Sequence, residues 1–332
     1  LTIQAGVEVR FRQGAGLYVG NNDTWDTQYK GALQAIGGVS EEDRILFTSD
    51  VSPRNPGDWD GITFGNETQS DASQLSYVTV QYGGSYRGNS SNIYCESASP
   101  SITHSDILDS GYYGISLNAS AARLEGNTIA RSRSQGVSLH GEAEDGEAFV
   151  IGNTITEHEG DGIEWGRAPG RLEGNTIRSN QGHGLSAYRS KMAVIDNILS
   201  DNTQDAMNVG AEILAQSHGN SGSGNGRDLI AVRGGQIETD TTWTQEMFAD
   251  TALPYLITGT IQVHARQTGR PAPTLTLQPG VTLRFESYGG IQIGYAYSNH
   301  RYEGLLEARG TAQAPISFIS AKQSPETGDW QG

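Results

Sequence analysis

Three side chains capable of acid/base chemistry occupy similar places in three short apolar phrases of the chain. His140 ends the phrase at 136–140, Glu164 lies inside 162–166, and Tyr188 ends 184–188. Side chains alternate between the two faces of a strand, so all three fall on the outward face. If the phrases stack as neighbouring rungs, Glu164 lies about 5 Å from the rung on either side, and His140 and Tyr188 lie about 10 Å apart around it. A carboxylate, an imidazole and a phenol on one strip could act as general acid and base on a sugar.

The plain interpretation of this strip is a solvated polar face. None of its other outward positions carries Lys or Arg: Ser116, Asn118, Ser138, Gly166, Ser186, Asn208 and Gly210. We therefore expect the strip to be inert and assign no catalytic residue and no cofactor. Were the chain an enzyme, the catalytic residues would be His140, Glu164 and Tyr188.

Two acidic clusters could supply paired carboxylates for glycoside hydrolysis or oxygen ligands for Ca²⁺. They are Glu142/Glu144/Asp145 and Glu157/Glu159/Asp161. Neither has the spacing of an EF-hand or of a nonapeptide calcium repeat, and both resemble insertions in turns. Calcium is thus a candidate ligand, but we assign no metal site.

Aromatic residues in expected loops or turns could contact glycans or neighbouring chains. These are Trp25, Tyr29, Tyr82, Tyr86, Tyr112 and Tyr113. Trp59 and Trp330 share the phrase Gly-Asp-Trp-x-Gly, which fits either a sugar platform or a packing tryptophan beside a turn held by its Asp. We favour packing for both.

The elements that must position these residues are coils of a short repeat. The glycine–aliphatic phrases recur at spacings of 22, 26, 22 and 22 residues from Gly114, and four of the coils begin with an asparagine: Asn127, Asn153, Asn175 and Asn197. Short runs of Ile, Val and Leu between Gly, Asn and Ser indicate strands joined by tight turns. A fixed period of this length predicts a stack in which the aliphatic residues form the core and the asparagines form a ladder of amides.

At these residues the chain resembles the right-handed parallel β-helix proteins, the pectin-lyase-like superfamily, and in particular the large surface or secreted type of bacteria and archaea. The resemblance implies an all-β solenoid with coils of about 22 residues. The superfamily includes lyases, epimerases, hydrolases and adhesins, so the fold alone does not give the activity. No Lys or Arg of the strip matches the base or the charge neutraliser of its lyases, and the motifs of its uronan epimerases are absent.

Composition limits the partners. The formal net charge is -16 over 332 residues, which argues against nucleic acids and anionic membranes and makes a poor host for polyanionic pectate or alginate unless calcium bridges them. No apolar run is long enough for a membrane span. The single cysteine, Cys95, is expected in the core.

A longer repeat contains the short one. Residues 275–332 match 1–61, beginning at an offset of 274 and ending with the phrases at 57–61 and 328–332. We divide the chain into a first unit lacking its lead-in (1–242), a joint or lead-in (243–274) and the opening coils of a second unit (275–332). We expect a flexible loop at 217–226 and one short helix within 241–252. The sequence is expected to be a segment of a longer tandem-repeat protein.

We therefore predict a non-enzymatic, extracellular or cell-surface β-solenoid with a structural or adhesive role, whose partners are copies of itself, cell-surface components or glycans. The alternative is a polysaccharide lyase, epimerase or hydrolase, or a glycan-binding β-helix, using the strip around Glu164.

Overall fold

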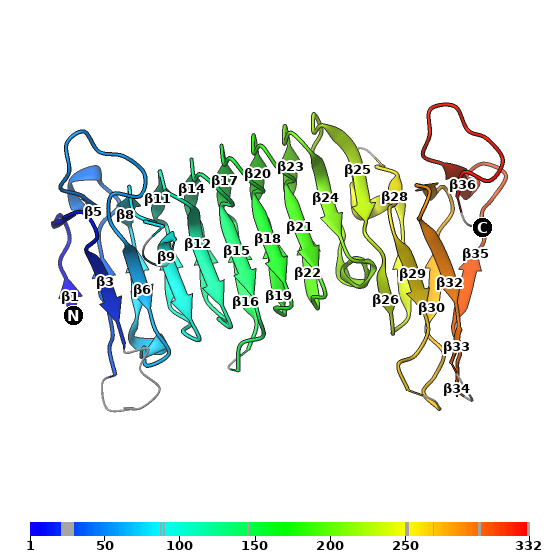
Figure 1. Cartoon of the computed structure of the whole chain (residues 1–332), viewed down its shortest axis with the longest axis horizontal. Helices are drawn as coiled ribbons and strands as arrows, with labels where there is room; N and C mark the ends of the chain where they lie inside the picture. The colour runs from blue at the N-terminus through cyan, green and yellow to red at the C-terminus, as the bar shows by residue number, and fades with distance from the viewer. Residues whose placement is uncertain are drawn as a thin grey trace.

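Parallel β-strands wound into a long rod make up the chain in the computed structural model (Figure 1). The structure describes residues 1–20, 30–86, 88, 90–144, 146–249, 252–267, 269–297 and 300–330. Three long sheets, A, B and C, run along the rod, and each turn from β1 to β24 adds a strand to them in that order. The all-β parallel β-helix predicted from the repeats is confirmed.

The strands of each sheet are given in their hydrogen-bonded order. Sheet A contains β1 (Thr2–Ile3), β4 (Gln34–Ile36), β7 (Gln74–Ser76), β10 (Ser101–Thr103), β13 (Arg123–Glu125), β16 (Ala148–Ile151), β19 (Gly170–Glu173) and β22 (Met192–Ile195). Sheet B contains β2 (Glu8–Phe11), β5 (Ile45–Ser49), β8 (Val78–Gln81), β11 (Asp106–Leu108), β14 (Thr128–Ala130), β17 (Thr154–Thr156), β20 (Thr176–Arg178) and β23 (Ile198–Ser200).

Sheet C is the longest. It contains β3 (Gly16–Val19), β6 (Gly61–Phe64), β9 (Ser91–Glu96), β12 (Tyr113–Asn118), β15 (Val137–His140), β18 (Ile163–Gly166), β21 (Leu185–Tyr188), β24 (Asp205–Val209), β25 (Arg227–Val232), β28 (Tyr255–Ile257), β31 (Thr282–Phe285) and β36 (Ser317–Ser320). Two short sheets complete the later coils. Sheet D is β26 (Gly235–Ile237), β29 (Thr260–Val263) and β32 (Gly290–Ile293), and sheet E is β27 (Thr241–Trp243), β30 (Thr274–Leu277) and β35 (Leu305–Ala308). An antiparallel hairpin, β33 (Tyr295–Tyr297) and β34 (His300–Tyr302), projects from the end of β32.

The core follows from strand alternation, because every second side chain of each strand points into the rod. In sheet C the inward residues stack in columns, and the first of these runs Ile115, Val137, Ile163, Leu185 and Met207, all fully buried. Trp165 lies in the neighbouring column and donates its indole N–H to Ala168 O at 2.7 Å. Cys95 is also buried there, and burial raises the pKa of its thiol.

The asparagines form a buried ladder along one corner. Each Nδ2 donates to the Oδ1 of the next rung, from Asn127 to Asn153, Asn175 and Asn197, at 2.9 Å each. The ladder continues to Asn220 at 3.0 Å. Asn220 belongs to 217–226, which we expected to be a flexible loop; that expectation was wrong, because the segment forms a further rung whose Ser221 N–H bonds Asn197 O at 2.8 Å.

A second buried ladder, which the sequence reading missed, closes another corner. His158, Asn180, Asn202 and Asn225 occupy successive rungs, and the amides of Asn180 and Asn202 each donate to the next Oδ1 at 2.9 Å. The imidazole of His158 accepts from Ser132 N at Nδ1 and meets Ile129 O at Nε2, at 3.0 and 3.1 Å. Burial lowers the pKa of His158 to about 3, so the ring is neutral in the folded chain.

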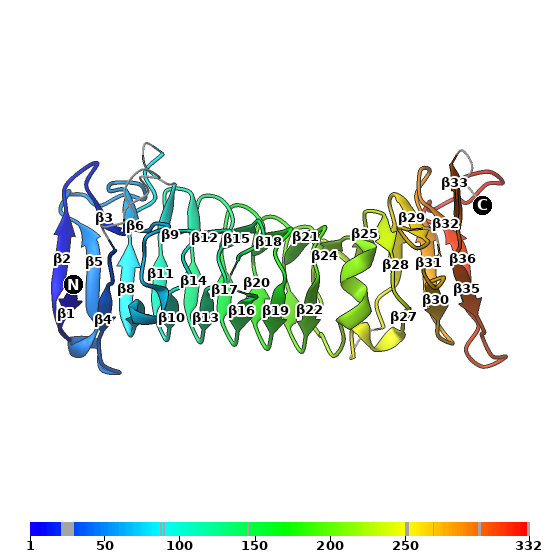
Figure 2. The ribbon, with the colours of Figure 1, turned by 90° about the horizontal axis from the view of Figure 1, so that it is seen from below.

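The helices differ from the single one expected within 241–252. A short 3₁₀ helix, η4 (Gln245–Met247), does lie there, but the longer η3 (Ala211–Gln216) separates β24 from β25 (Figure 2), and η1 (Glu41–Asp43) and η2 (Ser70–Ala72) occupy earlier corners. The helical segment η3 directly precedes 217–226, whose Gly, Ser and Asn content is typical of loops. Within the described residues no helix has the length and apolarity needed to cross a bilayer.

The two copies of the long repeat share local structure but not their sheets. By the sequence match, β30, β31 and β32 are the counterparts of β1, β2 and β3. However, β2 belongs to sheet B and β31 to sheet C, while β3 belongs to sheet C and β32 to sheet D. The chain therefore enters the second copy with its sheet assignment advanced by one strand. The change takes place between β24 and β26, where η3 and a register irregularity in the β24–β25 pairing interrupt the regular coils.

Trp59 and Trp330 are packing residues in both copies. Trp59 is fully buried, stacks on Phe11 with ring centroids 4.1 Å apart and donates its indole N–H to Gln81 O at 2.9 Å. Trp330 stacks on Phe285 at 4.2 Å. The preceding aspartates close the same turn, since Asp58 accepts from Ser49 Oγ at 2.7 Å and Asp329 accepts from Ser320 Oγ at 2.9 Å. The Trp59 ring, which is fully buried, leaves no face for a sugar.

Candidate functional site

The strip on the outer face of sheet C brings together the three residues predicted from the sequence. Strand register pairs His140 with Gly166 and Gly166 with Tyr188, so the imidazole and the phenol are two rungs apart. Tyr188 nevertheless reaches His140, with Oη 3.5 Å from Nδ1, and His140 Nε2 lies 3.9 Å from Glu164 Oε2. The predicted separation of about 10 Å applies to the backbone rungs only.

The missing side chain of Gly166 permits this contact. A Cβ at that position would lie 2.6 Å from Tyr188 Cζ and 3.1 Å from His140 Nδ1. Tyr188 therefore lies across the glycine rung instead of standing out from the sheet. The glycine that seemed neutral in the sequence determines the geometry of the strip.

Arg233 is a residue of the strip that the sequence reading missed, and it brings a cation next to outward positions that themselves carry neither Lys nor Arg. Val232 pairs with Val209, so Arg233 is one residue beyond that pair, in the column of Gly210 and Tyr188. Its guanidinium lies over the Tyr188 ring, 5.6 Å from the centroid. It also donates to Asn208 O at 2.9 Å and Ala187 O at 3.1 Å.

The electrostatics around Arg233 are mixed. Burial lowers the pKa of its guanidinium, and the nearby Asp161, Tyr188 and Glu164 act in the opposite direction. The carboxylate of Glu164 accepts from Gln135 Nε2 at 3.2 Å. The strip thus holds a chain of neighbouring groups in which Arg233 contacts Tyr188, Tyr188 contacts His140, and His140 lies beside Glu164.

A charged network lies on the same face, at the first residues of β24 and β25. Arg227 donates to both oxygens of the buried Asp205, at 2.6 and 2.9 Å, and His183 Nδ1 is 3.3 Å from Asp205 Oδ2. Burial opposes ionisation of Asp205, but the hydrogen bonds from His183 and Arg227 hold its pKa below the usual range. The backbone N–H of His183 donates to Asp161 Oδ1 at 2.7 Å. Asp161 thus belongs to this network, whereas Glu157 and Glu159 of the same predicted cluster are exposed to solvent.

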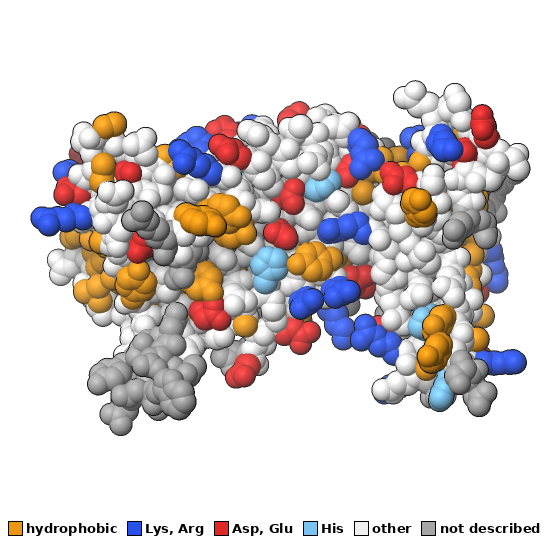
Figure 3. Space-filling view, in the orientation of Figure 1, with side chains coloured by type: hydrophobic (Ala, Val, Ile, Leu, Met, Phe, Trp, Pro, Cys, Tyr) orange, Lys and Arg blue, Asp and Glu red, His pale blue; other side chains and the backbone are white. Residues whose placement is uncertain are grey.

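A cationic edge runs along the ends of the strands. Arg167 and Arg189 follow β18 and β21 on adjacent rungs, and Lys191 comes two residues after Arg189. Both arginines have left-handed backbone, with φ of 60° and 51°. All three are exposed, and among the described residues none of them makes an ion pair. Figure 3 shows Lys and Arg side chains gathered below the centre of this face, next to a histidine.

The predicted aromatic contacts divide into several groups. Tyr112 and Tyr113 pack edge to face at 4.3 Å beside the strip, where burial, the hydrogen bond with Tyr112 and the charge of Glu164 raise the pKa of Tyr113. Tyr86 is 88% exposed, whereas Tyr82 packs partly against the core. Trp25 and Tyr29 lie outside the described residues. The structure therefore brings only the Tyr112–Tyr113 pair to the candidate site.

The predicted calcium clusters do not assemble in the part of the chain that the structure describes. There, no group of three or more His, Cys, Asp or Glu side chains is placed to hold a metal ion. Asp145 of the first cluster is not among the described residues. Calcium binding stays a prediction from the sequence.

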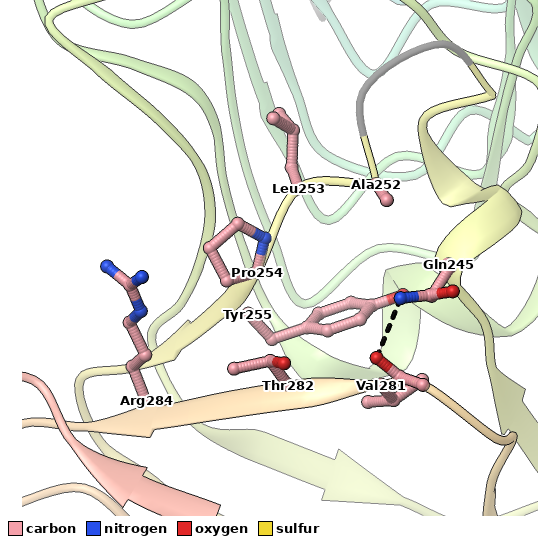
Figure 4. Close-up of a pocket in the computed structure, with 9 residues that line it drawn as sticks. Gln245, Ala252, Leu253, Pro254, Tyr255, Val281, Thr282 and Arg284 are labelled. Carbon is pink, nitrogen blue, oxygen red and sulfur yellow. Dashed lines mark hydrogen bonds between the residues drawn. The ribbon is translucent and has the colours of Figure 1, made fainter. Parts of the chain in front are cut away.

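A separate cavity lies at the joint. It has a volume of about 220 Å³ and is lined by residues including Gln245, Tyr255, Thr282 and Arg284 (Figure 4). Gln245 Nε2 crosses it to Gly280 O at 2.7 Å. It contains no carboxylate or imidazole, and none of the residues predicted to be functional lines it, so we assign it no role.

The fold defines the class of protein. The chain is a right-handed parallel β-helix repeat protein, and residues 91–241 match the family model described as right handed beta helix region. A search of curated proteins gives no match. The family model covers the regular coils that carry the strip but does not distinguish between the activities found on this fold.

Proposed function

We propose that the protein is a structural or adhesive β-solenoid of the cell exterior that holds an acidic polysaccharide along the strip of sheet C. The observation that carries the proposal is the contact between Arg233, Tyr188 and His140 beside the unpaired Arg167 and Arg189, in a chain of formal charge -16. Cations without partners in an acidic protein are where a carboxylated polymer would bind. The duplicated unit supports a structural role, because further copies lengthen the rod and increase the number of contacts that it can make with a ligand.

The openness of the strip favours binding over turnover. The side chains of His140 and Glu164 are 40% and 25% exposed, so water reaches both groups freely. Electrostatic catalysis depends on preorganised groups in a site from which water is excluded. An open face two or three columns wide suits an extended chain that lies along the rod and is held at several rungs.

Turnover of a uronate is the second candidate, favoured by the 3.5 Å contact between His140 and Tyr188. His140 would take the proton from the carbon next to the uronate carboxylate, and Tyr188 would protonate the leaving oxygen. Arg233 would stabilise the intermediate charge. Glu164 opposes this chemistry, because its carboxylate is 3.9 Å from the proposed base and repels an approaching carboxylate.

One experiment separates these functions. Binding of the whole chain to polygalacturonate and alginate is measured by affinity electrophoresis at low and high salt, and the same mixtures are monitored by ultraviolet absorbance for unsaturated products. We expect binding that weakens with salt, that falls about tenfold in Arg233→Gln, and that is unchanged in Arg178→Gln, an exposed arginine on sheet B. No binding would refute the proposal. Unsaturated products that disappear in His140→Ala would replace it with a lyase.

A further inference from the structure

A ladder of glutamines lies on the outer face of sheet D, with Gln236 and Gln262 half-buried and Gln292 exposed. Gln236, Gln262 and Gln292 pair in register on successive strands, while their neighbours Ile237, Ile261 and Val263 point into the core. Gln262 Nε2 donates to Gln292 Oε1 at 3.4 Å. The amides therefore repeat at the rung spacing of about 4.8 Å on a face open to solvent.

Aromatic side chains border this ladder. Gln236 Nε2 lies 3.2 Å from both Nδ1 and the backbone oxygen of His264. The His264 ring stacks on Tyr295 and packs against Tyr302, at centroid distances of 5.5 and 5.7 Å, where the β33–β34 hairpin leaves the sheet. Tyr297, on the same hairpin, is 69% exposed. The amides are thus joined through His264 to a wall of phenol rings.

The surface carries little charge compared with the rest of the chain. Among the described residues at this corner, Arg266 is paired with Glu238. The ladder and the tyrosine face of the hairpin offer amide donors and acceptors, phenol hydroxyls, ring faces and the imidazole of His300. The exposed Arg301 pairs with Ala296 and lies on the opposite face of the hairpin. An anionic polymer finds no unpaired cation in the ladder, and a protein partner would need an apolar patch where the glutamines are.

We propose that sheet D and the β33–β34 hairpin form a second polysaccharide site, which takes an uncharged glycan. Each amide can donate to one hydroxyl and accept from another, and the rung repeat allows a chain of similar sugar units to make the same contacts several times. Tyr297 supplies an exposed ring against which the carbon face of a sugar can pack. The site differs from the strip of sheet C in location and in ligand charge.

The long repeat explains the location of this site. Gln292 matches Tyr18 in the first unit, and the column of Tyr18 on sheet C continues through Thr63 and Tyr94 to Ser116 and Glu164. Gln292 is thus the sequence counterpart of a position in the column that carries Glu164, but it lies on sheet D because the sheet assignment has advanced by one strand. The two proposed sites therefore lie on different sheets, although they begin from matching positions of the long repeat.

The test is affinity electrophoresis of the whole chain in gels that contain a β-glucan, a galactomannan or a xylan, with polygalacturonate as the charged comparison. We expect retardation by at least one uncharged polymer that does not weaken with salt. Its apparent affinity should fall about fivefold or more in Gln262→Ala and in Tyr297→Ala. Gln278→Ala and Tyr288→Ala are matched controls, because both residues are exposed and lie outside this face.

Each outcome is decisive once circular dichroism shows that the variants are folded. Failure of all uncharged polymers to retard the chain, or equal retardation of the test and control variants, would overturn the proposal. So would self-association measured by ultracentrifugation that is lost in Gln262→Ala, since a second copy would then occupy the face. Binding of polygalacturonate that depends on Arg233 tests only the strip of sheet C, so the two proposals fail separately.

Discussion

The coils from β9 to β24 and those from β25 onward contain similar strands but turn their corners differently. The earlier coils share buried side-chain hydrogen bonds between rungs, through the two asparagine ladders. The later coils, beyond Asn220 and Asn225, instead pack aromatic residues such as Trp243 on Tyr255, with centroids 5.0 Å apart, and use loops of unequal length. Ladders require each rung to repeat its neighbour, whereas packing and loops allow variation. The regular part accordingly carries His140, Glu164 and Tyr188 of the strip, while Arg233 and the projecting hairpin belong to the later part.

The largest expected effect compares the two packing tryptophans. Trp59→Ala should destabilise its coils by about 4 kcal/mol, because it removes a fully buried ring and leaves Gln81 O without its partner. Trp330→Ala should cost less, since that ring is only partly buried. Urea unfolding followed by tryptophan fluorescence measures both. Equal effects would show that the two copies are held with the same strength.

Next comes the first ladder. Asn175→Ala should cost about 3 kcal/mol, because Asn153 Nδ2 and Asn197 Oδ1 both lose a buried partner. Gln262→Ala in the glutamine ladder should change stability by no more than about 0.5 kcal/mol. Urea midpoints of the two variants compare shared buried amides with solvated ones. A small effect of Asn175→Ala would mean that the ladder sets the register but contributes little to stability.

The second ladder predicts a pH dependence. His158 has a folded-state pKa of about 3, below that of an exposed histidine at about 6.5. Between these values the unfolded chain binds a proton that the folded chain does not, so stability falls by about 1.4 kcal/mol per pH unit as the pH decreases. His158→Asn matches Asn180 and Asn202 of the following rungs and should remove this part of the dependence. Thermal melts between pH 7 and pH 4.5 test it, and unchanged pH profiles would contradict a neutral buried His158.

A small stability effect is also expected at Gly166. Gly166→Ala should change stability by less than about 1 kcal/mol, because the side chain that it would meet first is the movable end of Tyr188. The new methyl group displaces the phenol from His140, so binding of acidic polysaccharide should weaken although the fold stays stable. Thermal stability and affinity electrophoresis separate the two effects. Unaltered binding would show that the Tyr188–His140 contact is not used by the ligand.

The period of the glycine and asparagine phrases was sufficient to predict the β-helix, since only stacked strands give both residues a repeated role. The same period also predicted that the side chains of His140, Glu164 and Tyr188 lie on the outward face of their strands. Three features were beyond its reach for physical reasons. Asn220 and Asn225 come at a spacing of 23 residues within a segment whose Gly and Ser content is typical of loops. Arg233 follows an irregularity in strand pairing, which no phrase marks. Tyr188 reaches across Gly166 because glycine has no side chain there, and the repeat pattern does not indicate this contact.

The advance of the sheets between the two copies was equally hidden from the sequence. The copies match over 1–61 and 275–332, while the change occurs between β24 and β26, in a stretch that lies outside the matched residues. Local phrases specify which residues point inward but not which long sheet a strand joins. That choice is made by η3 and by the β24–β25 pairing, both of which are tertiary features.

The asparagine ladders give the rod a direction. In both of them every amide-to-amide hydrogen bond runs from Nδ2 to the Oδ1 of the higher-numbered rung, so these bonds share one direction and strengthen one another. The other hydrogen of Nδ2 bonds a backbone oxygen of the preceding rung, as from Asn153 to Leu124 O. The two ends are then chemically unlike. The first oxygen, Asn127 Oδ1, is covered by Ser105 N–H at 2.9 Å, and the last amide of the second ladder, Asn225 Nδ2, is covered by Asp228 Oδ1 at 3.0 Å. A whole coil can be inserted between these caps without leaving any amide unsatisfied, so the regular segment can change length during evolution in steps of one coil while its caps stay fixed.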